Sequence, residues 1–105
     1  MVVGYINHAP SSTIYKNKQD KIIKFNEAFH FCEITWITER NTTSLIQSIK
    51  HIKPFLFVCC ELKELGKSPT DISELILSLT NLNIQVYIMD ADLYFVMTLK
   101  IQFIL

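Results

Sequence analysis

Residue types that bind metal ions or transfer protons are thinly spread along this sequence. His30 and Cys32 have suitable ligand atoms, but no nearby residue completes the tetrahedral set that zinc takes. Asp90 and Asp92 follow an apolar run, where a pair of aspartates more often closes a turn than binds a cation. The histidines are expected at the surface or in packing contacts rather than as catalytic bases. The sequence therefore predicts no metal ion and no cofactor.

Lysines that could contact phosphate gather in one segment, at Lys16, Lys18, Lys21 and Lys24. The whole chain has ten basic and ten acidic residues, so it lacks the basic footprint of a free-standing nucleic-acid-binding protein. These lysines are therefore predicted to form a solvated helix face. The two glycines, Gly4 and Gly66, are too few to build a glycine-rich phosphate loop.

The cysteines and the N-terminus indicate the compartment. The three cysteines are an odd number without CxxC spacing, which is typical of buried thiols in a reducing cytosol. The first ten residues have neither the basic start nor the apolar run of a signal peptide. The longest apolar tract, residues 93–105, is interrupted by Lys100 and Gln102 and is shorter than the roughly 20 residues of a membrane span. We expect a cytoplasmic protein that does not enter a membrane.

The spacing of apolar residues predicts alternating strands and helices. Strands are expected at residues 2–6, 33–38, 55–60 and 84–89; residues 55–60 are apolar throughout, as in the centre of a parallel sheet. Helices are expected from about residue 18 to 31, from Asn41 or Thr42 to before Pro54, and after a cap at Ser68 followed by Pro69. With 105 residues, 50% of them hydrophobic, the chain is predicted to be one α/β domain. We expect three layers, with helices on both faces of a mostly parallel four-stranded sheet.

Residues 95–105 fit two patterns. Phe95, Met97 and Leu99 begin an alternation that is typical of a strand, whereas Met97, Ile101 and Leu105 fall on one helical face. The sequence leaves both structures open for this segment.

Two segments resemble one known family. The first is the opening strand with Gly4 and Tyr5, which leads to a serine-containing loop with Gln19 beyond it. The second is LKELGKS at residues 62–68, between a buried strand and a capped helix. Together they resemble the catalytic domain of the serine site-specific recombinases, the resolvase and invertase family, whose motifs read roughly Gly-Tyr-x-Arg-Val-Ser and Leu-Asp-Arg-Leu-Gly-Arg-Ser. The resemblance extends from Val2 to about Asp92 and implies the fold of a resolvase catalytic domain.

The resemblance implies a catalytic site at which most of the catalytic residues have been replaced. Members of this family cut DNA with a serine hydroxyl that forms a phosphoserine link, while arginines hold the phosphate. By position, the nucleophile falls on Ala9, the motif aspartate on Lys63, and the arginines on Asn7, Asn41, Glu64 and Lys67. Lys67 keeps a positive charge, whereas Glu64 would repel a phosphate. We therefore expect a retained fold and lost DNA cleavage.

Two alternatives remain open. A repositioned loop could bring Ser11 or Ser12 to the place of the nucleophile, with Lys67 and Arg40 as remaining cations, in a recombinase subunit that is active when an intact partner supplies the rest. The simpler interpretation of residues 10–12 is a turn. In the second alternative, the chain is a flavodoxin-like binding module that shares only its α/β topology with recombinases.

The resemblance also implies partners. In relatives a long helix after the fourth strand forms the dimer interface and leads to a helix-turn-helix DNA-binding domain. Since this chain ends at Leu105, we expect it to lack the full helix and that domain, and to bind DNA weakly or not at all by itself. The apolar residues of segment 97–105 would then pair with a second copy or with an intact recombinase. Such a chain would be a remnant of a mobile element.

Overall fold

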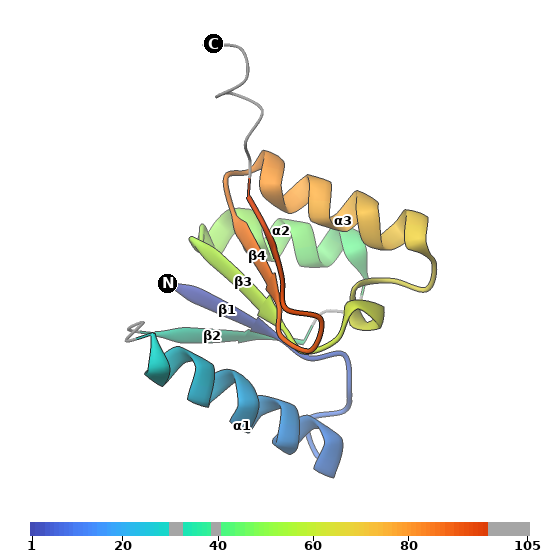
Figure 1. The fold of residues 1–105 in the computed structure, drawn as a ribbon. Helices are drawn as coiled ribbons and strands as arrows, with labels where there is room; N and C mark the ends of the chain where they lie inside the picture. Colours follow the sequence, from blue (N-terminus) through green and yellow to red (C-terminus); the bar gives the residue numbers. More distant parts are fainter. Residues whose placement is uncertain (30–32, 39–40, 97–105) are drawn as a thin grey trace.

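The computed structural model describes residues 1–29, 33–38 and 41–96 (Figure 1). Within these residues one sheet contains five strands: β1 (Val2–Tyr5), β2 (Ile34–Ile37), β3 (Leu56–Cys59), β4 (Gln85–Ile88) and β5 (Leu93–Phe95). The same ranges contain the helices α1 (Thr13–Ala28), α2 (Thr42–Ile52) and α3 (Pro69–Asn81) and a short 3₁₀ helix, η1 (Leu62–Leu65). The strand order is β2-β1-β3-β4-β5, with β1 to β4 parallel and β5 antiparallel to β4. The prediction of a mostly parallel α/β sheet is confirmed.

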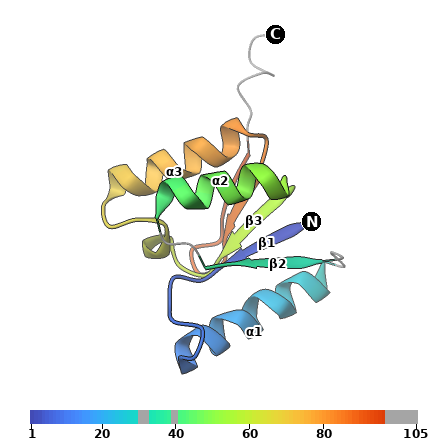
Figure 2. The ribbon, with the colours of Figure 1, turned by 180° about the vertical axis from the view of Figure 1, so that it is seen from behind.

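Helices cover both faces of the sheet, as predicted, but unequally. Helix α1 lies alone on one face, and α2 and α3 lie together on the other (Figure 1, Figure 2). Alternate residues of each strand point to opposite faces. Val3, Phe57 and Val86 therefore belong to the cluster under α2 and α3. Val2 and Val58 belong to the cluster under α1.

Strands β1 and β3 form the centre of the sheet, and all of their residues are buried. Each is paired on both sides and covered on both faces, which is why their sequences, VVGY and LFVC, contain no charged residue. A Cβ atom at Gly4 would lie 2.5 Å from the ring of Trp36 on β2. Glycine is therefore required here because the tryptophan ring packs directly on the backbone of β1.

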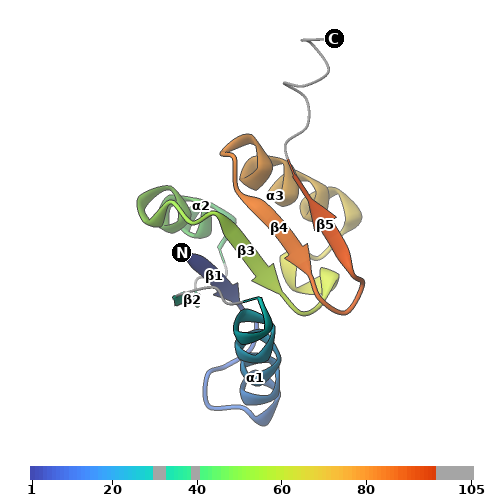
Figure 3. The same ribbon diagram turned by 60° about the vertical axis from the view of Figure 1, so that its left-hand side comes forward.

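Strand β5 is the difference between the predicted and the observed sheet. After β4 the chain reverses through residues 89–92, where the Asp92 amide donates to the Met89 carbonyl at 3.2 Å. The Tyr87 hydroxyl donates to Asp92 Oδ1 at 2.9 Å and ties the turn to β4. Figure 3 shows β5 running back beside β4. The prediction of four strands was wrong because a three-residue strand is too short for its alternation to be distinguished by sequence alone.

Helix α1 starts at Thr13, earlier than the predicted start at about residue 18. The cause is Ser12, whose Oγ accepts a hydrogen bond from the Tyr15 amide at 3.0 Å and so caps the helix. The apolar periodicity that predicted the helix begins only at Ile22, which lies about two and a half turns after Thr13.

The starts of α2 and α3 agree with the predicted caps. Ser68 Oγ accepts a hydrogen bond from the Asp71 amide at 3.2 Å, with Pro69 in the first helical position. Of the two candidates for α2, Asn41 is the cap, and its Oδ1 accepts from the Ser44 amide at 3.1 Å.

Arg40, one of the candidate cations, lies outside the described residues. Residues 97–105, which make up most of the segment that fits both a strand and a helix, also lie outside them. Phe95, the first residue of that segment, belongs to β5. Across the described ranges, no helix combines the length and the apolar character needed to cross a membrane.

Candidate functional site

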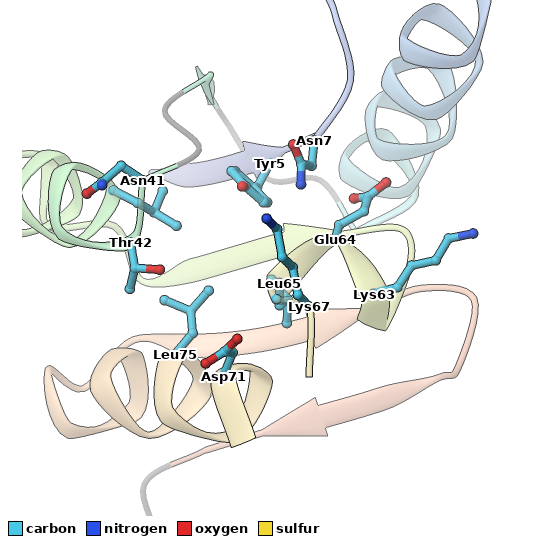
Figure 4. Close-up of a pocket in the computed structure, with 12 residues that line it drawn as sticks. Tyr5, Asn7, Asn41, Thr42, Lys63, Glu64, Leu65, Lys67, Asp71 and Leu75 are labelled. Atoms are coloured by element: carbon cyan, nitrogen blue, oxygen red, sulfur yellow. The ribbon is translucent and has the colours of Figure 1, made fainter. Parts of the chain in front are cut away.

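A pocket of about 870 Å³ opens where the carboxyl ends of β1 and β3 meet the N-termini of α2 and α3 (Figure 4). Because β1 and β3 are adjacent and parallel, the loops that follow them leave the sheet at the same edge. The pocket is lined by β1 and its following loop, the start of α2, the η1 segment and α3.

Five of the positions that the recombinase resemblance singled out line this pocket: Asn7, Asn41, Lys63, Glu64 and Lys67. They come from the loop after β1, the cap of α2, and η1 with its following loop. In Figure 4, Lys67 points toward Tyr5 and Asn7, whereas Lys63 points away from them. The fold thus brings together segments that are distant in the sequence and that the resemblance treats as one site.

The η1 segment is held in place by a close approach at Gly66. A Cβ atom at this position would lie 2.8 Å from Cβ of Asp71, in the first turn of α3. The φ angle of Gly66 is 175°, an extended conformation that any residue adopts. Space rather than backbone conformation therefore requires glycine here, and this contact positions Lys67 at the pocket.

The three candidate nucleophile positions are not among the described residues that line the pocket. Ala9 has no hydroxyl group, and Ser11 is exposed. Ser12 Oγ donates to the Ala9 carbonyl at 2.8 Å and accepts from the Tyr15 amide, so its hydroxyl serves as the cap of α1. The turn interpretation accounts for this loop, since the Ser12 amide also donates to the Ala9 carbonyl at 2.9 Å.

A buried ion pair between Lys18 of α1 and Glu64 of η1 lies beside the pocket. The Lys18 side chain is 9% exposed and that of Glu64 is 2% exposed. Lys18 Nζ also lies 3.2 Å from Glu61 Oε1 and 3.2 Å from His8 Nε2. An ammonium group only donates hydrogen bonds, so this ring nitrogen of His8 must act as the acceptor.

The prediction of a solvated lysine face is wrong for Lys18, although Lys16, Lys21 and Lys24 are exposed. Lys18 lies three residues after Tyr15 and four before Ile22, both of which pack against the sheet. That spacing puts Lys18 on the buried stripe of α1. That spacing is the signal in the sequence for a buried Lys18, whereas its contacts with Glu61, Glu64 and His8 come from remote segments and were not predicted.

The charges of this cluster alternate in sign. Burial raises the pKa of Glu64, and its hydrogen bond with Lys18 offsets this only in part. Burial opposes the charge of Lys18, but its hydrogen bonds and attraction to Glu64 and Glu61 outweigh burial and raise the pKa of the ammonium group. Hydrogen bonds from Lys63, at 3.0 Å, and from Lys18 lower the pKa of Glu61. With Lys63 included, the side chains form a row of alternating charges, Lys63, Glu61, Lys18 and Glu64. The two positive and two negative charges in this row cancel.

Glu64 retains one unsatisfied atom. Its Oε2 is buried and has no hydrogen-bond partner among the residues that the structure describes. Burying a carboxylate oxygen without a partner is costly, because the hydrogen bonds that it makes with water are lost. Glu64 is thus both a lining residue of the pocket and the partner of the buried Lys18.

Cys59 and Cys60 are free, buried thiols. Because successive residues of an extended chain point to opposite faces, Cys59 belongs to the cluster under α2 and α3, and Cys60 to the cluster under α1. Burial raises the pKa of Cys60 to about 11 and that of Cys59 further. Both thiols are therefore protonated near neutral pH and unsuited to act as nucleophiles.

The described residues contain no group of three or more His, Cys, Asp or Glu side chains placed to hold a metal ion. The two aspartates considered in the sequence take other roles. Asp90 lies 3.5 Å from Lys21 Nζ, and Asp92 accepts from Tyr87 in the turn before β5.

The fold is similar to that of a solved recombinase domain. The N-terminal catalytic domain of TP901-1 integrase, a serine recombinase, superposes with a TM-score of 0.71 at 16% sequence identity, covering 89% of this chain and 79% of the other. No protein-family model matches the chain. No curated protein matches it in sequence. The chain therefore has the mixed α/β fold of a serine recombinase catalytic domain, as the sequence motifs predicted.

Proposed function

We propose that this chain is a single resolvase-like domain, over residues 1–105, that keeps the architecture of a DNA-cleaving site but does not cut DNA. The observation that carries the proposal is the make-up of the pocket. Asn7, Asn41 and Glu64 stand where the resemblance implies guanidinium groups, and Ala9 stands where it implies the nucleophile. No serine is among the described residues that line the pocket, so a phosphoserine bond cannot form there.

The remaining charges also support inactivity. Lys63 and Lys67 provide ammonium groups, which act as point charges and lack the bidentate geometry with which arginine grips a phosphate. Glu64 adds a negative charge, although Lys18 balances it. A phosphodiester would therefore be held weakly, and charge developing in a transition state would lack the fixed donors that usually stabilise it.

The serines of the loop after β1 give little support to an active alternative. The Ser12 hydroxyl is used as a helix cap, and Ser11 is exposed and outside the pocket lining. The likeness to the integrase catalytic domain also favours a recombinase-like domain over a binding module that shares only α/β topology.

We further propose that the chain acts in the cytoplasm and associates with DNA only weakly by itself. The balanced net charge supports weak DNA binding, and the buried free thiols suit a reducing compartment. The apolar sequence of residues 97–105 supports association with a second copy or with an intact recombinase. The chain would then be a non-cleaving subunit derived from a mobile element.

The test is an assay for a covalent protein–DNA link. The chain is incubated with supercoiled DNA that carries candidate crossover sites, then denatured and separated by gel electrophoresis, with an intact serine recombinase on its own site as positive control. We expect no adduct from this chain, alone or mixed with the intact enzyme. An adduct that disappears in Ser11→Ala or Ser12→Ala would instead establish a conditionally active subunit.

A further inference from the structure

Among the described residues, the charged side chains that line the pocket at the carboxyl ends of β1 and β3 are Lys63, Lys67, Glu64 and Asp71. Two of them have an ion-pair partner outside the pocket lining. Glu64 is buried against Lys18, and Lys63 contacts Glu61 at 3.0 Å. Lys67 and Asp71 form no ion pair with any residue that the structure describes. The pocket therefore presents one positive and one negative charge that are free to contact a ligand.

These two charges are held apart in the pocket. Lys67 follows η1, and Asp71 lies in the first turn of α3. In Figure 4 the Lys67 ammonium group points toward Tyr5 and Asn7, away from the Asp71 carboxylate. Both charged residues are exposed, so a ligand can reach them. A ligand that balances both charges must carry a negative and a positive group at separate places.

The rest of the lining suits a ligand that is partly apolar. Its apolar part includes three buried leucines, Leu45, Leu65 and Leu75. Asn7 and Thr42 add neutral groups that can both donate and accept hydrogen bonds. Small-molecule sites usually combine an apolar lining with a few polar groups that fix the orientation of the ligand. With a volume of about 870 Å³, the pocket has room for a molecule of amino-acid size.

We propose that this pocket binds a zwitterion of the amino-acid type, with its carboxylate at Lys67, its ammonium group at Asp71 and an apolar side chain toward the leucines. A simple anion would balance Lys67 but be repelled by Asp71, and a simple cation would meet the reverse arrangement. The inference goes beyond the proposed function and rests on it in one respect, since a pocket that held a phosphodiester would not be free for this ligand.

The first experiment compares three related probes on the wild-type chain. L-leucine carries both charges, leucinamide lacks the carboxylate, and N-acetyl-L-leucine lacks the ammonium group. Each is titrated at constant ionic strength and about pH 6, where α-amino groups are protonated, while the backbone amide shifts of Gly66 and Thr42 are followed by NMR. We expect leucine to bind at least about tenfold more tightly than either analogue, because each analogue loses one hydrogen-bonded charge contact.

The second experiment assigns each charge of the ligand to one side chain. Lys67→Gln should weaken leucine binding at least about tenfold and remove the preference for leucine over leucinamide. Asp71→Asn should weaken it similarly and remove the preference for leucine over N-acetyl-L-leucine. The matched controls are Lys16→Gln and Glu74→Gln, which neutralise exposed residues outside the pocket lining and should leave all three affinities unchanged.

Several results would overturn the proposal. They are equal affinities of the wild-type chain for the three probes, no detectable binding of leucine, and a loss of affinity for all three probes alike in both variants. Tighter binding of inorganic phosphate than of leucine would also overturn it, because the pocket would then be an anion site. The comparison of probes on the wild-type chain does not depend on whether a variant folds. A covalent DNA adduct would contradict the proposed function instead, and it is measured in a separate assay.

Discussion

The two faces of the sheet are buried in different ways. Under α2 and α3 the contact is an apolar cluster that includes Phe57, Leu75 and Leu79. Under α1 a smaller apolar cluster ends at the carboxyl edge of the sheet in the buried pair of Lys18 and Glu64. Removing apolar surface from water stabilises a fold directly, whereas a buried ion pair must first overcome the loss of hydration of both charges.

The two faces differ in where they bury charge. The apolar face carries most of the packing and contains no buried charge among its described residues. On the α1 side, the charges of Lys18 and Glu64 are buried, and Glu64 also lines the pocket. The pocket itself lies on the α2 and α3 side, since Tyr5, Leu65 and Leu75 of that cluster line it, and Glu64 links it to the buried charge of α1.

The largest effect is expected from the apolar face. Leu79 is fully buried, so Leu79→Ala should lower the free energy of unfolding by about 4 kcal/mol through lost burial and the cavity that remains. Leu77 on the same helix is 56% exposed, and Leu77→Ala should change it by less than about 0.5 kcal/mol. Urea denaturation measures both, and similar losses in the two variants would contradict the assigned face of α3.

On the α1 face, Lys18→Met should lower the free energy of unfolding by about 3 kcal/mol, because it leaves the Glu64 carboxylate buried without its cation. The double variant Lys18→Met/Glu64→Leu removes both charges and should recover most of the loss. Lys21→Met is the matched control, since Lys21 and its partner Asp90 are exposed. A Lys18 variant no less stable than the Lys21 variant would rule out the buried pair.

The buried thiol of Cys60 on the α1 side should make the free energy of unfolding depend on pH. The pKa of Cys60 is raised from 9.0 to about 11. A raised folded-state pKa contributes stability below the unfolded-state pKa, and this contribution is lost as the pH rises through the folded-state value. The free energy of unfolding should therefore fall between pH 9.0 and about 11, by up to about 1.4 kcal/mol per pH unit. Denaturation at several pH values should show a shallower fall for Cys60→Ala, and an unchanged slope would exclude this thiol as the cause.

The smallest effect is expected at the start of α1. Ser12→Ala removes the cap and should cost about 1 kcal/mol, while Ser11→Ala at the exposed neighbouring position should be nearly neutral. Thermal denaturation of the two variants makes the comparison. Equal destabilisation by Ser11→Ala would mean that the loop uses its hydroxyl groups differently from the structure.

Much of the fold was predictable because its signals are local. The apolar run of β3 and the Ser68-Pro69 start of α3 depend on neighbours within a few residues, and both predictions were confirmed. The motifs around Gly4 and residues 62–68 also pointed to the observed fold. Strand β5 was missed because three residues carry too little pattern until β4 is present to pair with them.

The amino-acid sequence by itself determined four of the strands and the caps of α2 and α3, and which groups differ from those of a recombinase site, because residue identity and short-range spacing suffice for both. Only the tertiary structure decided that Lys18 is buried on Glu64 and that five distant positions share one pocket. Burial and charge pairing depend on neighbours that the chain brings in from remote segments. For that reason, a lysine that looks solvated in the sequence is the buried partner of Glu64 beside the pocket.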